Sequence, residues 1–161
     1  MLDAARGLAV LAAATLSMAL ATACGGSSSS PAATAAPTAT PSPLVSTATA
    51  TVAGKSETIL VDGKGMTLYY YLPDKGGQVT CTGQCAVAWP PLMLPSGQAK
   101  PTGTGLSSAL DAVDSPAGGK QVTYNRWPLY GWQKDQKPGD TTGQGVGGKW
   151  FVVTPDVQPA G

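Results

Sequence analysis

The sequence predicts an all-β domain made of two similar β-hairpin-based repeats that pack with approximate two-fold pseudo-symmetry. The first observation is a doubled motif, in which Tyr, any residue, an aromatic, two residues and Asp occur at 69–74 and again at 130–135. A segment that recurs at a fixed distance indicates a repeated structural unit. The second observation is a series of short β-rich runs with turn signals at intervals of about ten residues, which is typical of all-β domains.

The chain divides into three segments of different composition. Residues 1–23 predict a signal peptide of the lipoprotein type, because an arginine precedes an Ala-rich apolar run that is short for a membrane span. Residues 24–54 contain mostly Ser, Thr, Ala and Pro, and we expect a disordered linker there. Residues 55–161 are expected to form the folded domain, with repeat 1 at about 57–95 and repeat 2 at about 106–156.

Cys24 is the expected lipidation site. It follows small residues at the end of the apolar run and directly precedes the linker, which resembles a bacterial lipoprotein signal. The chain has three cysteines, an odd number for an exported protein, and lipidation of Cys24 leaves Cys81 and Cys85 as a pair. The expected location is the extracytoplasmic face of the cell membrane, with the lipid as the membrane contact. Ordinary secretion with cleavage nearby is the alternative.

Turn signals place the elements of the folded segment. Two β-rich runs at 57–61 and 66–72 flank an Asp-Gly turn, and runs at 121–124 and 128–133 flank Asn125 and Arg126, so each pair predicts a hairpin. Residues 106–113 have helical apolar spacing, but we expect a strand because a hairpin-like turn follows. A last strand is expected at 149–154, and one short helical turn at 85–89, where two prolines end it.

The aromatic residues of the motif are expected to face the core. Side chains at even separations in a strand share a face, and the aromatic face offers the larger apolar area. The aspartates are expected to fix the turns that follow, because Pro and Gly surround them. An aromatic ligand-binding surface is the alternative. The residues to which we assign this structural role are Tyr69, Tyr71, Asp74, Tyr130, Trp132 and Asp135.

Composition narrows the possible functions. The chain has no histidine, which removes the commonest general base and metal ligand, and its net charge is +1. A balanced and sparse charge argues against binding to nucleic acid. We therefore expect no catalytic residue, no metal ligand and no cofactor, and we predict a protein that is not an enzyme.

Cys81 and Cys85 enclose a three-residue loop. In an exported domain the expectation is a structural disulfide. Because it closes so small a loop, it is expected to stabilise the domain by about 2 kcal/mol. The alternative is an extracellular redox pair or a soft-metal site for Cu(I), with Met66 or Met93 as a further ligand.

The two loops also share a Thr-Gly-Gln triplet, at 82–84 and 142–144. Aligning these triplets places Thr141 and Gly145 of repeat 2 opposite Cys81 and Cys85 of repeat 1. The second loop is therefore expected to fold without a bridge.

The doubled motif, behind a cysteine that follows small residues, resembles a family of predicted bacterial lipoproteins whose domain is described as a secreted repeat of unknown function. The resemblance spans about 57–155, and it rests also on the segments at 81–92, 122–125 and 138–145. Arg126 departs from it, since related repeats usually have Gly there. The resemblance implies an exported, membrane-anchored envelope protein and brings no known activity. We therefore expect a non-enzymatic module that binds a still unidentified envelope partner or ligand.

Overall fold

The computed structural model describes residues 42–161. The predicted signal peptide, Cys24 and the linker as far as residue 41 lie outside the described residues. No helix within the described part is long and apolar enough to cross a membrane.

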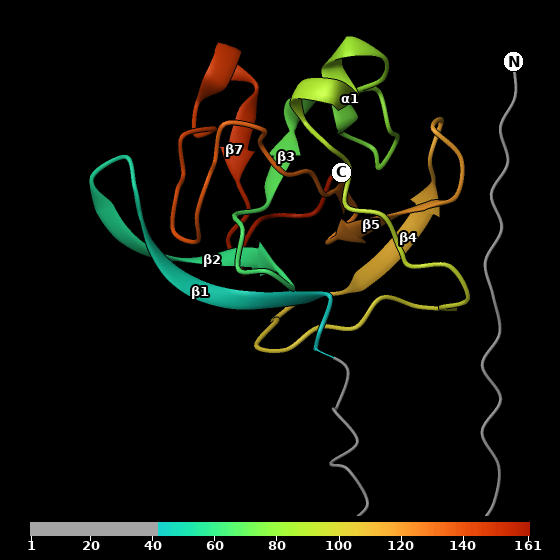
Figure 1. The fold of residues 1–161 in the computed structure, drawn as a ribbon, viewed down its shortest axis with the longest axis horizontal. Helices are drawn as coiled ribbons and strands as arrows, with labels where there is room; N and C mark the ends of the chain where they lie inside the picture. Colours follow the sequence, from blue (N-terminus) through green and yellow to red (C-terminus); the bar gives the residue numbers. More distant parts are fainter. Residues whose placement is uncertain (1–41) are drawn as a thin grey trace, which may run out of the picture. The chain divides into compact units, whose positions relative to one another are not determined.

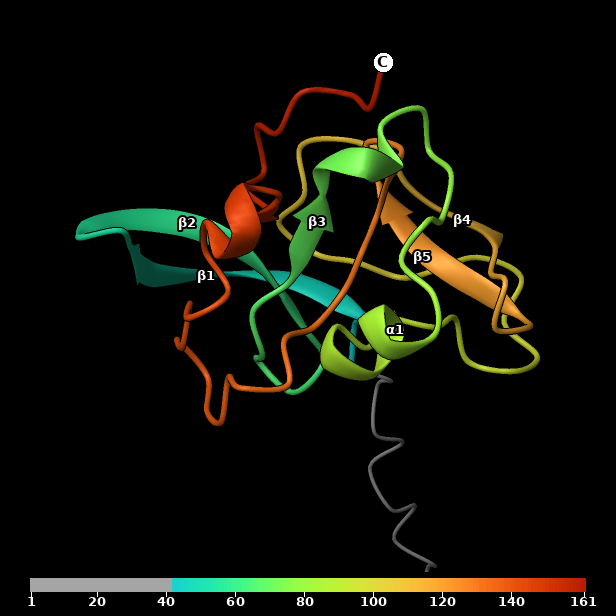
Figure 2. The ribbon, with the colours of Figure 1, turned by 90° about the horizontal axis from the view of Figure 1, so that it is seen from above.

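The domain is all-β, as predicted, and consists of three small antiparallel sheets (Figure 1). The sheets are β1–β2, β3–β7 and β4–β5–β6. In two perpendicular views, β3 lies between the β1–β2 hairpin and the β4–β5 pair (Figures 1 and 2). The elements are β1 (Val45–Val52), β2 (Lys55–Asp62), β3 (Tyr69–Tyr71), η1 (Leu72–Asp74), α1 (Gln84–Ala88), β4 (Leu110–Asp114), β5 (Lys120–Tyr124), β6 (Trp127–Pro128), η2 (Val146–Gly148) and β7 (Trp150–Val152).

Strand β1 corrects the predicted linker boundary. It lies inside the segment expected to be disordered as far as residue 54, yet it pairs with β2 from Val45↔Asp62 to Val52↔Lys55. Ala53 and Gly54 both have positive φ, which suits a two-residue hairpin turn. The composition was misleading because Thr and Ala look like a low-complexity tether, whereas Thr and Val are β-branched and favour strands.

The predicted turns are present, but the first of them does not join the strands of a hairpin, because β2 pairs with β1 and β3 pairs with β7. After β2, Oδ1 of Asp62 accepts hydrogen bonds from the backbone N–H groups of Lys64 and Met66, at 2.8 and 2.9 Å. After β5, Asn125 and Arg126 both have positive φ, so the departure at Arg126 is accommodated in a left-handed conformation. The strand expected at 106–113 is β4, which begins only at Leu110, and the helical turn expected at 85–89 is α1.

Backbone hydrogen bonds recur in the two halves and reveal the pseudo-symmetry. In the first half, the Leu60 N–H donates to Val153 O at 2.8 Å and the Leu68 N–H to Leu60 O at 2.9 Å. The equivalent bonds in the second half are Val122 N–H to Leu92 O at 2.8 Å and Leu129 N–H to Val122 O at 2.9 Å. These bonds make Leu60 and Val122 structurally equivalent.

Two hydrophobic clusters form the core. One is aliphatic and includes Val45, Leu60, Leu68, Val122, Leu129 and Val153, together with Tyr124. The other is largely aromatic and is built around the motif tyrosines and two tryptophans: Tyr69, Trp89, Tyr130 and Trp150.

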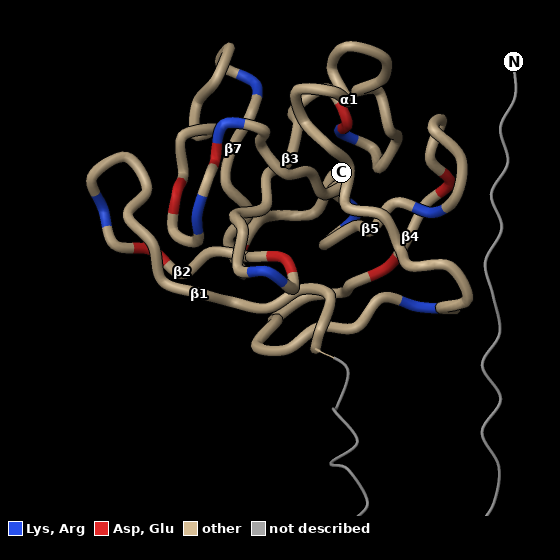
Figure 3. Tube along the Cα trace, in the orientation of Figure 1, with Lys and Arg blue, Asp and Glu red and all other residues tan. Residues whose placement is uncertain are grey.

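Charged residues of both signs are dispersed along the chain, in strands as well as in turns and loops (Figure 3). Within residues 42–161 a single ion pair is present, in which Lys120 Nζ lies 2.8 Å from Asp114 Oδ1 at the end of the β4–β5 hairpin. Both side chains are exposed, so this pair contributes little to stability.

Candidate functional site

The two motif tyrosines meet at the centre of the fold. The Tyr69 N–H donates to Tyr130 O at 2.8 Å, and the Tyr130 N–H donates to Tyr69 O at 3.0 Å. Each motif segment also pairs with the segment around the last Trp of the other repeat, as in Tyr71↔Trp150 and in the bond from Gly131 N–H to Pro90 O at 2.8 Å. The repeats therefore exchange strands across their common axis.

Each motif also supplies a tyrosine to the aspartate of the other motif. The Tyr69 hydroxyl donates to Asp135 Oδ2 at 2.6 Å, and the Tyr130 hydroxyl donates to Asp74 Oδ2 at 2.5 Å. Both tyrosines and Asp74 are completely buried, and Asp135 is 8% exposed. The doubled motif is thus one reciprocal structure rather than two separate ones.

The second oxygen of each aspartate closes the loop that follows it. Asp74 Oδ1 accepts from the backbone N–H and the hydroxyl of Thr80, at 2.8 and 2.5 Å. Asp135 Oδ1 accepts from the same two groups of Thr142, at 3.0 and 2.6 Å. Both carboxylate oxygens therefore have donors, which a buried carboxylate requires.

The phenols are held in their protonated form. Burial first, and the hydrogen bond to Asp135 second, raise the pKa of Tyr69 well above its usual value, and a 3.2 Å hydrogen bond from Gly143 N–H opposes this rise. Burial and the bond to Asp74 raise the pKa of Tyr130 in the same way. A general acid or base works best with a pKa near the working pH, so these pairs are suited to fixed hydrogen bonding rather than to proton transfer.

Four aromatic rings form a stack across the repeat axis. Trp89 and Trp150, which close the two repeats, lie parallel with ring centroids 3.8 Å apart. Tyr71 stacks on Trp150 at 4.3 Å, and Trp132 stacks on Trp89 at 3.9 Å. Lys134 Nζ lies 5.6 Å from the centre of the Trp132 ring. Tyr71 and Trp132 are half-buried at the two ends of the stack, whereas Tyr69 and Tyr130 face the core completely, as strand parity predicts.

The loop equivalence expected from the Thr-Gly-Gln triplets is wrong. Thr80 and Thr142 hold the same position on their aspartates, so the residues that follow them, Cys81 and Gly143, are equivalent. A Cβ at Gly143 would lie 2.7 Å from the Tyr69 ring and 2.9 Å from Trp89, so any larger residue here would have to displace one of these rings. The sequence signal for this alignment is the Thr that follows each motif Asp by six or seven positions.

Cys81 and Cys85 form a disulfide, with their Cα atoms 5.3 Å apart. Cys81 is 3% exposed and packs in the aromatic cluster, and Cys85 lies in α1. Met66 lies in the turn after β2, and Met93 pairs with Gln121. Among residues 42–161 there is no group of three or more His, Cys, Asp or Glu placed to hold a metal ion.

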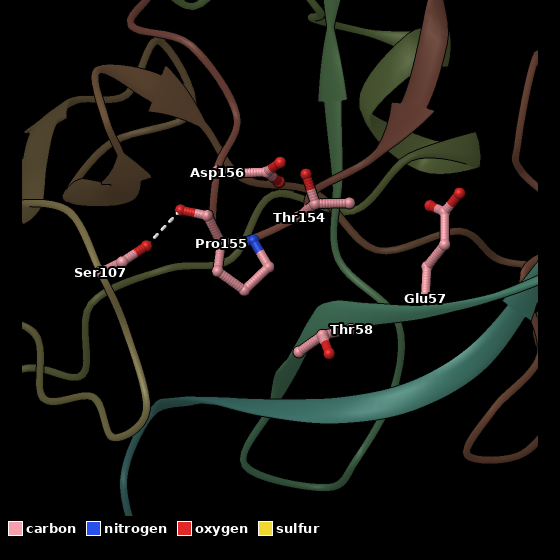
Figure 4. A pocket seen from close by; sticks show the side chains of 6 residues that line it. All are labelled: Glu57, Thr58, Ser107, Thr154, Pro155 and Asp156. Carbon is pink, nitrogen blue, oxygen red and sulfur yellow. Dashed lines mark hydrogen bonds between the residues drawn. The ribbon is translucent and has the colours of Figure 1, made fainter.

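A separate opening on the surface is lined by none of the motif residues. That opening is a groove of about 560 Å³, within the range of small-ligand sites, and it lies where β2, the segment before β4 and the segment after β7 converge (Figure 4). The Thr154 hydroxyl lowers the pKa of Asp156, and Ser107 Oγ donates to Pro155 O at 2.6 Å. The lining residues are Glu57, Thr58, Ser107, Thr154, Pro155 and Asp156. No sequence pattern indicates this groove, because its walls come from three distant segments.

A family model described as a secreted repeat of unknown function matches the chain twice, at residues 50–93 and 111–154, which together make up more than half of its length. The chain belongs to this family of secreted repeats. No curated protein and no solved structure matches the chain. Each matched copy of the secreted repeat contains one tyrosine–aspartate motif and one closing tryptophan, so the reciprocal bonds and the ring stack join one copy to the other.

Proposed function

We propose that this secreted protein is a lipid-anchored, non-enzymatic binding module of the bacterial envelope, and that it holds its ligand in the groove between β2 and the segment after β7. The observation that carries the proposal is the groove itself. Two carboxylates and three hydroxyls line it, and its six lining residues include no Lys or Arg. Such a surface attracts cationic groups and offers hydrogen bonds to hydroxyls.

The ligand class follows from this chemistry. Glu57 and Asp156 place two carboxyl groups on the groove wall, so an ammonium group of a ligand would find an acidic partner there. The Ser107 hydroxyl already donates to Pro155 O, whereas Thr58 is an exposed hydroxyl in the groove wall. We infer a ligand that carries both amino and hydroxyl groups. Polymers of amino sugars whose attached peptides carry amines have both groups.

The hydrogen bonds of the motif residues support a non-catalytic role. The paired tyrosines and aspartates are buried and fully occupied with each other and with the loop threonines. These groups stabilise the interlocked repeats, which in turn hold the three groove segments in fixed positions. Rigid support of this kind favours binding, because little order must be gained when the ligand arrives.

Binding can be tested by cosedimentation with purified cell-wall sacculi, which carry amines and hydroxyls. The test variant is Glu57→Gln with Asp156→Asn, and the matched control is Asp111→Asn with Asp114→Asn, which removes the same charge at two exposed sites in β4. We expect the wild type and the control to sediment with sacculi in a salt-sensitive manner, and the groove variant to bind several-fold more weakly. Equal binding by the groove variant, or no binding by the wild type, would refute the groove as the site.

Anchoring is tested separately by fractionation of cells. The wild type should be found with membranes and should carry a lipid, and Cys24→Ala should be released. A Cys24→Ala protein that stays with the membrane would rule out Cys24 as the anchor.

The second candidate is a redox or Cu(I)-handling protein that uses Cys81 and Cys85. One observation favours it: the bridge is present in repeat 1 alone, since Gly143 takes the place of Cys81 in repeat 2. Thiol labelling and metal analysis of the purified protein distinguish the two candidates. A fully oxidised, unreactive and metal-free pair would exclude the redox function, whereas labelling or bound copper in the native protein would support it.

A further inference from the structure

The groove of Figure 4 continues into a second opening, which we call the side hollow. Thr154 and Asp156, on the segment after β7, line both openings. The side hollow has a volume of about 480 Å³, and its walls come from β3, η1 and the segment 157–159. A ligand that occupies the groove can therefore extend past Asp156 into a second space.

The side hollow has an apolar wall, which distinguishes it from the groove. Among the large apolar side chains of residues 42–161, Leu72 and Val87 are the exposed ones, and Leu72 lines the hollow with 41% of its surface exposed. Tyr70, Val157 and Pro159 line it as well. An exposed leucine among such neighbours favours contact with an apolar group of a ligand.

Lys75 adds a positive charge that the lining of the groove lacks. It is exposed and lines the side hollow together with Asp156. The single ion pair within residues 42–161 joins Lys120 to Asp114, so Lys75 and Asp156 share the hollow without pairing with each other. A carboxylate of a ligand would find a cationic partner at Lys75, and an amine would find an acidic one at Asp156.

Hydrogen bonds hold the walls of the side hollow in place. The Leu72 N–H donates to Lys149 O at 2.9 Å, and the Lys75 N–H donates to Leu72 O at 3.1 Å. On the segment after β7, Gln158 O accepts a hydrogen bond from Trp127 Nε1 at 2.8 Å. Because the hollow is formed by fixed segments, a ligand need not order them when it binds.

The residues that give the side hollow its apolar and cationic character belong to repeat 1 alone. The motif tyrosines and aspartates occur in both repeats, because the reciprocal core requires them. Repeat 2 has Gly131, Gln133 and Gln136 at the positions of Tyr70, Leu72 and Lys75. The reciprocal core therefore does not explain these three residues of repeat 1.

We propose that the side hollow binds a peptide segment of the ligand, with its apolar side chains against Leu72, its free carboxylate at Lys75 and an amine at Asp156. A peptide carries all three kinds of group in one chain. This inference rests on the proposed function, because the two openings share Asp156. It deepens that function by assigning the peptide part of an envelope polymer to the side hollow.

The test uses the tripeptide lysyl-alanyl-alanine as the probe and its C-terminal amide as the matched partner without the carboxylate, with binding to the full chain measured by isothermal titration calorimetry. We expect the free acid to bind about threefold to fivefold more tightly than the amide, as an exposed ion pair provides. Lys75→Gln should abolish this preference, whereas Lys64→Gln, which removes the same charge from an exposed turn, should keep it. Equal affinities of the wild type for the two peptides, or an unchanged preference in Lys75→Gln, would overturn the proposal.

The apolar wall is tested with a second pair of variants. Leu72→Ser should weaken the binding of both peptides by about threefold, because part of the apolar contact is lost. Val87→Ser is the matched control, since Val87 is 63% exposed and does not line the hollow. Both changes are at exposed side chains, so we expect both variants to fold. Undiminished binding by Leu72→Ser would show that the peptide lies elsewhere.

Failure of this inference can be distinguished from failure of the groove. A wild type that sediments with sacculi through Glu57 and Asp156, but binds neither tripeptide, would overturn the side hollow alone. A wild type that binds the free acid through Lys75, but does not sediment with sacculi, would support the peptide site and refute the proposed envelope target.

Discussion

The Tyr69 hydroxyl donates a 2.6 Å hydrogen bond to Asp135, a residue 66 positions away in the other repeat. The reciprocal bond runs from Tyr130 to Asp74. Neither repeat can satisfy its own buried aspartate, so each depends on the other for a complete core. The doubled motif therefore explains why the two repeats fold as one domain.

Removing one of these hydroxyls should destabilise the domain. Tyr69→Phe keeps the ring but leaves Asp135 Oδ2 buried without its donor, and we expect the free energy of unfolding to fall by about 1–3 kcal/mol. Tyr130→Phe should cost a similar amount. The measurement is urea-induced unfolding followed by tryptophan fluorescence. Tyr71→Phe is the matched control, because Tyr71 is half-buried and the variant keeps its ring in the stack. A loss from Tyr71→Phe as large as that from Tyr69→Phe would contradict the role of the hydrogen bond.

Stability should fall steeply at alkaline pH. The pKa values of Tyr69 and Tyr130 are raised in the folded state, whereas tyrosine in the unfolded chain ionises near pH 10. Below that pH the contribution of the pair is fully present. Above it the unfolded state loses two protons that the folded state keeps, so the free energy of unfolding should fall by about 2.7 kcal/mol per pH unit.

The alkaline slope can be assigned to individual residues. Burial also raises the pKa of Tyr70, which adds a smaller effect in the same direction. Each of Tyr69→Phe and Tyr130→Phe should reduce the slope by about one proton, or about 1.4 kcal/mol per pH unit, in unfolding experiments between pH 9 and 11. An unchanged slope in both variants would show that these phenols ionise as readily in the folded state as in the unfolded state.

The ring stack should be most sensitive at its centre. Trp89 is 4% exposed and contacts Trp132 and Trp150, so Trp89→Ala should lower the free energy of unfolding by about 3–5 kcal/mol. Trp132→Ala, at the half-buried end, should cost less and should remove only part of the near-ultraviolet circular dichroism of the stack. The opposite order of the two losses would mean that the end of the stack carries more of its stability than the centre.

The disulfide should stabilise without being required for folding. The bridge closes a loop of only four positions, so Cys81→Ser with Cys85→Ser should lower the free energy of unfolding by about 2 kcal/mol and keep the native spectrum. The Asp74–Thr80 bonds hold the start of this loop without the bridge. Thermal unfolding of the oxidised, reduced and double-serine proteins checks this, and a double variant that does not fold would show that the bridge determines the fold.

Local patterns in the sequence predict the fold well but predict the partners of its residues poorly. Strand parity correctly orients Tyr69 and Tyr130 toward the core, and the turn residues identify the turn after Asp62 and the hairpin after Tyr124. Periodicity reveals which face a side chain occupies but not which distant residue it meets. Only the three-dimensional structure therefore shows that Tyr69 donates a hydrogen bond to Asp135 and that three segments meet at the groove.

Gly143 offers a final test of the interlocked core. A methyl group there would lie 2.7 Å from the Tyr69 ring and 2.9 Å from Trp89, and both rings belong to the buried aromatic cluster. Gly143→Ala should therefore lower the free energy of unfolding by about 1–3 kcal/mol, because an overpacked core displaces its side chains. Gly131→Ala is the matched control, since its added methyl group meets only Pro90 O at 3.9 Å. Equal unfolding midpoints in urea for the two variants would show that the contact between the Gly143 loop and Tyr69 is looser than the structure indicates.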